Sequence, residues 1–119
     1  MTDLPLTLTL RAVPGEYCLL TVDGEVDHHT APQLRAALDR VPFAPGQLLV
    51  VDLARLTYCD STGITALVTA HQQARAAGSS LTLAAVSPGL SRVLEIAGLD
   101  QLFSVRPTVA DAIEVHLAQ

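Results

Sequence analysis

The chain contains no lysine and no tryptophan, and only four of its 119 residues are aromatic. Its seven basic residues are all arginines scattered along the sequence, and its formal net charge is −5. Sequence-independent binding to nucleic acid needs clustered positive charge, so we expect no nucleic-acid partner. The absence of lysine also excludes a phosphate-binding loop of the Walker type, in which a lysine contacts the phosphates.

Long apolar runs are missing as well. No run approaches the roughly 20 residues that a membrane-spanning helix requires, and the N-terminus lacks the basic and apolar segments of a secretion signal. The two cysteines, Cys18 and Cys59, stand in apolar surroundings without the spacing of a metal site, as expected in a reducing compartment. We therefore expect a soluble, cytoplasmic protein with no membrane partner and no metal.

Apolar residues make up 50% of the chain, and with so few aromatics the core has to be built mainly from Leu, Val, Ile and Ala. A chain of this length buries roughly two-thirds of its unfolded surface and needs neither a disulfide nor a metal to fold. No linker, repeat or low-complexity tract interrupts it, so residues 4–118 are predicted to form a single domain.

Hydrophobic periodicity predicts the local structure. Alternating or continuous apolar stretches predict strands near residues 6–11, 17–23, 48–53, 81–86 and 103–105, with Gly24 ending the second strand. Helical spacing predicts helices that begin after Thr30, Asp60, Ser87 and Thr108. Thr30 and Gln33 have the spacing of a capping box, and the third helix is expected to bury Leu90, Val93, Leu94 and Ala97.

The resulting order, ββαβαβαβα, is typical of an α/β domain. We expect a mixed, mostly parallel sheet of four or five strands with about four helices, in which the opening hairpin contributes one antiparallel edge. The stretch 48–53 shows no alternation, so it is predicted to be a central strand that is covered on both faces.

The segment Asp60-Ser61-Thr62-Gly63 joins this central strand to the helix that follows it. Asp60 is suited to cap the helix, which places Ser61 and Thr62 in the first turn, where backbone N–H groups have no partner within the helix. A capping role alone would explain these residues, because they are common at helix starts. Alternatively, Ser61 accepts a phosphate, since a helix start tolerates an anion, and Thr62 is the next hydroxyl along the chain.

A polar loop from Glu25 to Thr30 follows the second strand. The loops that follow parallel strands gather at one edge of the sheet, so we expect Asp27 and His28 to lie towards Ser61. A simple polar turn, with Thr30 as a helix cap, would account for the same residues.

The same residues also raise the alternatives of metal binding and catalysis. His28 and His29 suggest zinc, but adjacent side chains point in different directions, and no Cys or Asp spacing completes a tetrahedral site. A hydrolase with Ser61 as nucleophile and His28 as base would also need an orienting group and an oxyanion hole, and the chain has no Gly-x-Ser-x-Gly elbow. His71 lies on the apolar face of its helix and fits the core better. These residues favour a binding module that is not an enzyme.

Four segments carry a resemblance to a known family: Gly24–Ala31, Val51–Leu53, Tyr58–Ile64 and Ala85–Leu99. With them the sequence resembles the STAS family, specifically the bacterial anti-sigma-factor antagonists, over nearly the whole chain. It departs from the usual family pattern at Cys59 and at Ile64-Thr65. Cys59 is small and apolar enough to pack, whereas Thr65 is placed to alter the choice of partner.

The resemblance implies a function. In this family the unphosphorylated antagonist binds an anti-sigma factor, a serine kinase of the histidine-kinase-like ATPase fold, and so frees a sigma factor. The kinase phosphorylates the antagonist, and a phosphatase reverses the modification. By position, Ser61 is then the phosphoacceptor, and ATP and Mg²⁺ belong to the kinase, so no cofactor is implied for this chain. The implied docking surface comprises Glu25, Asp27, His28, Asp60, Ser61, Thr62, Gly63 and Ile64.

A second hypothesis stays open on the same resemblance. A STAS module without a phosphoswitch could serve as a subunit of a membrane lipid- or anion-transport complex. It predicts stable association with an ATPase or permease and no phosphate on Ser61.

Overall fold

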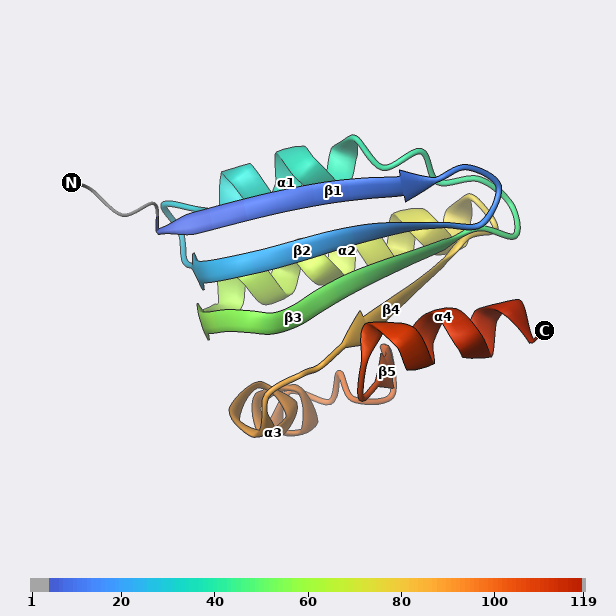
Figure 1. Ribbon diagram of the computed structural model, residues 1–119. Coiled ribbons are helices and arrows are strands. Elements are labelled where there is room, and N and C mark those ends of the chain that lie inside the picture. Colours follow the sequence, from blue (N-terminus) through green and yellow to red (C-terminus); the bar gives the residue numbers. More distant parts are fainter. Residues whose placement is uncertain (1–4, 119) are drawn as a thin grey trace.

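The computed structural model describes residues 5–118, so residue 4 of the predicted domain lies outside the described residues. Its elements follow the predicted order: β1 (Leu6–Val13), β2 (Tyr17–Val26), α1 (Ala31–Asp39), β3 (Leu48–Cys59), α2 (Ser61–Ala76), β4 (Ser80–Ala84), α3 (Pro88–Ile96), β5 (Ser104–Arg106) and α4 (Val109–Leu117). The strands form one sheet in the order β1-β2-β3-β4-β5 (Figure 1). Only β1 is antiparallel to its neighbour, which confirms the α/β fold with a hairpin edge.

Helices cover both faces of the sheet (Figure 1). The buried residues of α1, α2 and α3 form one core with Leu49 and Val51 of β3. Ala112 of α4 packs against Leu48 and Val50 on the opposite face. Alternate residues of β3 therefore point into two different cores, which confirms that residues 48–53 begin a central strand buried on both sides.

Strand β3 continues beyond its predicted end at residue 53, as far as Cys59. It pairs with β4 only over Leu48–Asp52, and the remaining residues pair with β2 alone. Two irregularities place an extra β3 residue opposite β2, and the Asp52 carboxylate accepts the Ala54 N–H at the first of them (3.0 Å). Such bulges shift the side-chain alternation, so periodicity could not reveal the second half of the strand.

Strand β2 also runs past Gly24, which was wrongly predicted to end it. Gly24 pairs with Leu6 and Leu56 inside the sheet, at a φ of 120°. A side chain there would collide with the Pro5 carbonyl, whose oxygen accepts the Glu25 N–H (2.7 Å). The glycine therefore permits a close approach of two backbones and does not end the strand.

Three expectations in the C-terminal part need correction. β4 ends at Ala84, two residues before its predicted end, because Ala85 adopts a φ of 57°. β5 begins one residue after its predicted start at Phe103, whose side chain is buried in the core. In α3 only Leu90 and Leu94 are buried, whereas Val93 is 45% exposed and Ala97 is also exposed. This short helix presents one narrow i, i+4 stripe to the core, so its remaining apolar side chains face outward.

His71 of α2 is buried, as its position on the apolar face predicted, and it lies edge-on to Phe103 with ring centroids 5.7 Å apart. Neither ring nitrogen has a hydrogen-bond partner within residues 5–118. Burial, followed by the nearby charge of Arg75, lowers the pKa of His71 from its ordinary value of 6.5. The fold therefore favours the neutral ring.

This burial makes stability depend on pH. As the pH falls below about 6.5, His71 takes up a proton in the unfolded chain before it does so in the folded protein. The free energy of unfolding should therefore fall with pH, by at most about 1.4 kcal/mol per pH unit. The fall ends once the pH is below the pKa of His71 in the folded protein. We expect His71→Leu to remove this fall and to stabilise the protein at neutral pH by about 1 kcal/mol, because two unpartnered polar atoms disappear. Urea unfolding between about pH 7 and pH 5 measures both effects. His29→Gln, at an exposed histidine, is the control; an unchanged pH dependence in His71→Leu would contradict the assignment.

Candidate functional site

The candidate site lies where β2 and β3 end side by side. Val26 pairs with Cys59 in the last register position, and the Asp60 N–H donates to the Val26 carbonyl (3.0 Å). β4 pairs with β3 only as far as Asp52, and β1 pairs with β2 only as far as Gly24, so the last two pairs of β2 and β3 lie at the end of the sheet. The pairing places the loop after β2 beside the start of α2, as the parallel arrangement predicted.

The loop from Asp27 to Thr30 is held by its own side chains. The Asp27 carboxylate accepts the N–H groups of His29 (2.9 Å) and Thr30 (3.0 Å), and these bonds, that of Thr30 first, lower the pKa of Asp27. The Thr30 hydroxyl donates to the Glu25 carbonyl (2.8 Å) and accepts the Asp27 N–H. The Thr30 hydroxyl makes no capping bond to α1, so the predicted capping box with Gln33 is wrong. The hydroxyl closes the preceding loop instead.

Asp60 caps α2, as predicted. One of its carboxylate oxygens accepts the N–H groups of Thr62 (2.9 Å) and Gly63 (3.4 Å) and also the Thr62 hydroxyl. The bond from the Thr62 hydroxyl is the largest cause of the lowered pKa of Asp60, and the charge of His28 adds to it. Two of the backbone donors at this helix start, the N–H groups of Thr62 and Gly63, are therefore already occupied by a side chain of the same chain.

The three hydroxyls of the first helical turns differ in availability. The Thr62 hydroxyl donates to Asp60, and the Thr65 hydroxyl donates to the Ser61 carbonyl (2.8 Å). The Ser61 side chain is exposed, and within the described part of the chain its hydroxyl makes no hydrogen bond. Ser61 thus presents the one uncommitted hydroxyl of this group.

Gly63 lets α2 start close to both strands. An ideal Cβ at Gly63 would lie 2.6 Å from Cys59 Sγ and 2.6 Å from Val26 Cγ1, nearer than real Cβ contacts. Cys59 packs against the main core, as expected of a small apolar replacement. Burial and the adjacent Asp60 charge raise the pKa of the Cys59 thiol to about 11, so it stays protonated at neutral pH.

Arg35 is a neighbour that the sequence did not single out. With Ser61, Thr62 and Thr65 it lines a hollow of about 160 Å³ between α1 and α2. Arg35 is exposed, and it forms no ion pair among residues 5–118. It occupies an ordinary position on the polar face of α1, and only the packing of α1 beside α2 brings it to Ser61.

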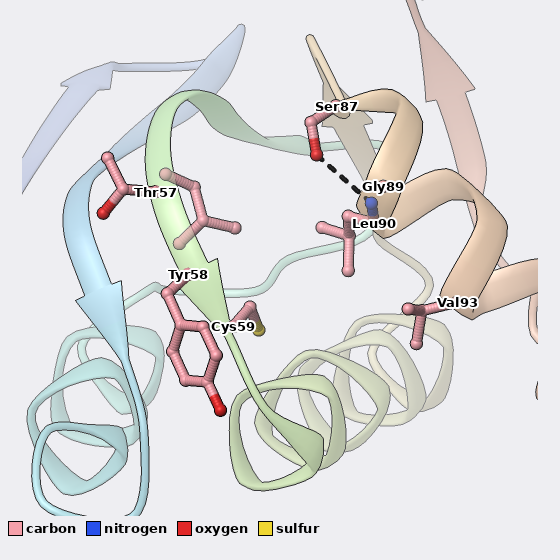
Figure 2. Close-up of a pocket in the computed structure, with 8 residues that line it drawn as sticks. Thr57, Tyr58, Cys59, Ser87, Gly89, Leu90 and Val93 are labelled. Atoms are coloured by element: carbon pink, nitrogen blue, oxygen red, sulfur yellow. Dashed lines mark hydrogen bonds between the residues drawn. The ribbon is translucent and has the colours of Figure 1, made fainter.

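A second hollow, of about 220 Å³, lies between the far half of β3 and α3. Figure 2 shows Leu90 and Val93 of α3 across from the strand that carries Tyr58 and Cys59. The Ser87 hydroxyl accepts the Leu90 N–H (3.2 Å) and fixes the start of α3 there. Tyr58 is 53% exposed, so an aromatic side chain stands at the surface just before the Asp60 loop.

His28 and His29 stack on each other with ring centroids 4.0 Å apart, and both are exposed. Within residues 5–118, no three His, Cys, Asp or Glu side chains are grouped so that they could hold a metal ion. The same residues show no hydrogen bond between His28 and Ser61. No helix among them is long and apolar enough to cross a membrane.

The packing around Gly63 can be tested by substitution. Gly63→Ala should lower the free energy of unfolding by roughly 1–3 kcal/mol, because the new methyl group forces Cys59 and Val26 apart. Gly89→Ala is a matched control near the start of α3, where an added Cβ meets nothing within 4 Å. Alanine's higher helix propensity should make that change neutral or stabilising, by up to about 1 kcal/mol. Equal effects in urea unfolding would contradict the role given to Gly63.

Comparison with known proteins places these features in a family. The chain is 36% identical over 101 residues to an anti-sigma-B factor antagonist of Listeria monocytogenes, covering 85% of this chain and 89% of that protein. The Bacillus subtilis anti-sigma-B factor antagonist is 34% identical, covering 72% and 78%. An anti-sigma factor antagonist from Mycobacterium paratuberculosis has a similar structure, with a TM-score of 0.82, 27% identity and 94% of both chains covered. The family model of the STAS domain matches residues 8–112, and the chain belongs to the STAS domain family.

Proposed function

We propose that this protein is an anti-sigma-factor antagonist controlled by phosphorylation of Ser61. In this proposal the unphosphorylated protein binds an anti-sigma factor that is also a serine kinase of the histidine-kinase-like ATPase fold, and a sigma factor is released. A phosphatase acting on phospho-Ser61 restores binding. The Listeria and Bacillus relatives, at 36% and 34% identity, bear the name of antagonists of an anti-sigma factor, which supports the general function.

The observation that carries the proposal is the exposed, uncommitted hydroxyl of Ser61 beside a capped helix start. The neighbouring Thr62 is a poorer acceptor, because its hydroxyl proton is already donated to Asp60. In the transfer, a bond forms between Ser61 Oγ and the γ-phosphorus of ATP, the bond from that phosphorus to ADP breaks, and the hydroxyl proton passes to a base. ATP, Mg²⁺ and that base belong to the kinase, so this chain acts as substrate and binding partner.

Phosphorylation at Ser61 would change the surface and leave the fold intact. The hydroxyl is exposed, so a phosphate adds roughly −1.5 to −2 charges without entering the core. The new dianion would stand next to the Asp60 carboxylate, on the surface made by Glu25, Asp27, His28, Asp60, Ser61, Thr62, Gly63 and Ile64. A partner seated on this surface would meet both added bulk and added negative charge, so its affinity should fall.

The proposal is tested with purified variants as baits in lysate of the source organism. We expect wild type and Ser61→Ala to retain an anti-sigma factor, and Ser61→Asp to bind it at least about tenfold more weakly, a loss of roughly 1.4 kcal/mol. Ser104→Asp, at an exposed serine of the outermost strand β5, adds the same charge elsewhere and should bind like wild type. Binding constants from calorimetry with the captured partner, and mass spectrometry after incubation with ATP, give the affinity and the modified residue.

Two outcomes would contradict the proposal. Equal binding of the partner by all four baits would show that charge at Ser61 does not control docking. Retention of a membrane ATPase or permease by all baits, with no phosphate on Ser61 in native protein, would favour the transport-module hypothesis. Phosphate on Thr62 alone would overturn the choice of acceptor.

A further inference from the structure

The hollow between α1 and α2 holds an arginine whose charge no other group in the described chain neutralises. Arg35 lines it from α1, and Ser61, Thr62 and Thr65 line it from the first two turns of α2. Asp39 lies one turn further along α1, yet the one ion pair within residues 5–118 joins Arg55 to Asp23. The guanidinium is therefore available to a ligand that appears beside Ser61.

Apart from those of Ser61 itself, the other hydrogen-bond donors around this hollow are already engaged. The N–H groups of Thr62 and Gly63 donate to the Asp60 carboxylate, and so does the Thr62 hydroxyl. The Thr65 hydroxyl donates to the Ser61 carbonyl. An anion on Ser61 could use the N–H groups of Thr62 and Gly63 only by displacing Asp60, and it would stand close to that carboxylate. Arg35 supplies the uncommitted donors and the opposite charge.

We propose that Arg35 is the intramolecular partner of the phosphate on Ser61. This inference rests on the proposed function and deepens it, because it names what holds the modified residue. A guanidinium presents a planar set of N–H donors that matches two phosphate oxygens at once, and such charge-assisted pairs are stronger than neutral hydrogen bonds. Arg35 on α1 and Ser61 on α2 belong to different helices, so the pair would join the two across the hollow.

The pairing gives phosphorylation a second effect on the surface. In the unphosphorylated protein the Arg35 charge forms no ion pair within residues 5–118, in a chain of net charge −5. Once the phosphate forms, Arg35 is neutralised and held against Ser61, so one modification adds an anion and removes a free cation. It also offsets repulsion between the phosphate and Asp60, which keeps the start of α2 intact.

The test uses protein that carries phosphoserine at position 61, introduced during translation, so that neither kinase nor partner is required. Phosphorus NMR follows the second ionisation of the phosphate as the pH is changed. We expect its pKa in wild type to be lower than in Arg35→Gln by about half a unit, because a nearby cation favours the dianion. Arg35→Lys should fall between them. Arg75→Gln, about 20 Å away along α2, removes the same charge and should match wild type.

A second measurement does not depend on a substitution. The Nε–H resonance of Arg35 should move on phosphorylation of the wild type, while that of Arg75 should not. Equal phosphate pKa values in wild type, Arg35→Gln and Arg75→Gln, together with an unmoved Arg35 resonance, would overturn the inference. A failed pairing leaves the binding experiments with Ser61→Asp unaffected, and failed binding leaves this titration unaffected, so the two proposals are judged separately.

Discussion

The pairing of the last residues of β2 with the last residues of β3 positions every part of the candidate site. Val26 faces Cys59, and the next residue, Asp60, donates its N–H back to the Val26 carbonyl. The loop that begins at Asp27 and the helix that begins at Ser61 therefore leave the sheet at neighbouring points. Gly63 completes the arrangement, because the missing side chain lets α2 start against both strands at once.

Beyond Asp52 of β3, this part of the sheet consists of β1, β2 and β3 only. β3 outruns β4 by seven residues, from Leu53 to Cys59, and it does so with bulges that keep Leu56 and Cys59 turned towards the core. Leu53 is buried in the same core, whereas Ala54, Arg55, Thr57 and Tyr58 are exposed. The extension carries the start of α2 beyond the end of β4, where Ser61 and Thr62 are exposed.

Two of the three acidic residues of the site, Asp27 and Asp60, have their carboxylates directed at the backbone. Asp27 accepts the N–H groups of His29 and Thr30, and Asp60 accepts those of Thr62 and Gly63. Both carboxylates are stabilised in the charged form by these bonds, which is why the pKa of each is lowered. They order the two loops, and the exposed Ser61 hydroxyl makes no hydrogen bond among residues 5–118. Because the N–H groups of Thr62 and Gly63 already donate to Asp60, the proposed partner of an anion at Ser61 is Arg35.

Local patterns alone determined the order of the elements, the doubly buried strand at 48–53 and the cap at Asp60, since each depends on residues close in the chain. Sequence also identified Ser61, through its place between strand and helix and the resemblance to a family. Tertiary structure decided the rest. Gly24 looked like a strand end because nothing nearby shows that Pro5 lies against it, and Thr30 looked like a helix cap because its contact with Glu25 needs the folded loop. Arg35 and Ser61 are 26 residues apart in the sequence. They line one hollow only because α1 and α2 pack on the same face of the sheet, and no periodicity within either helix encodes that arrangement.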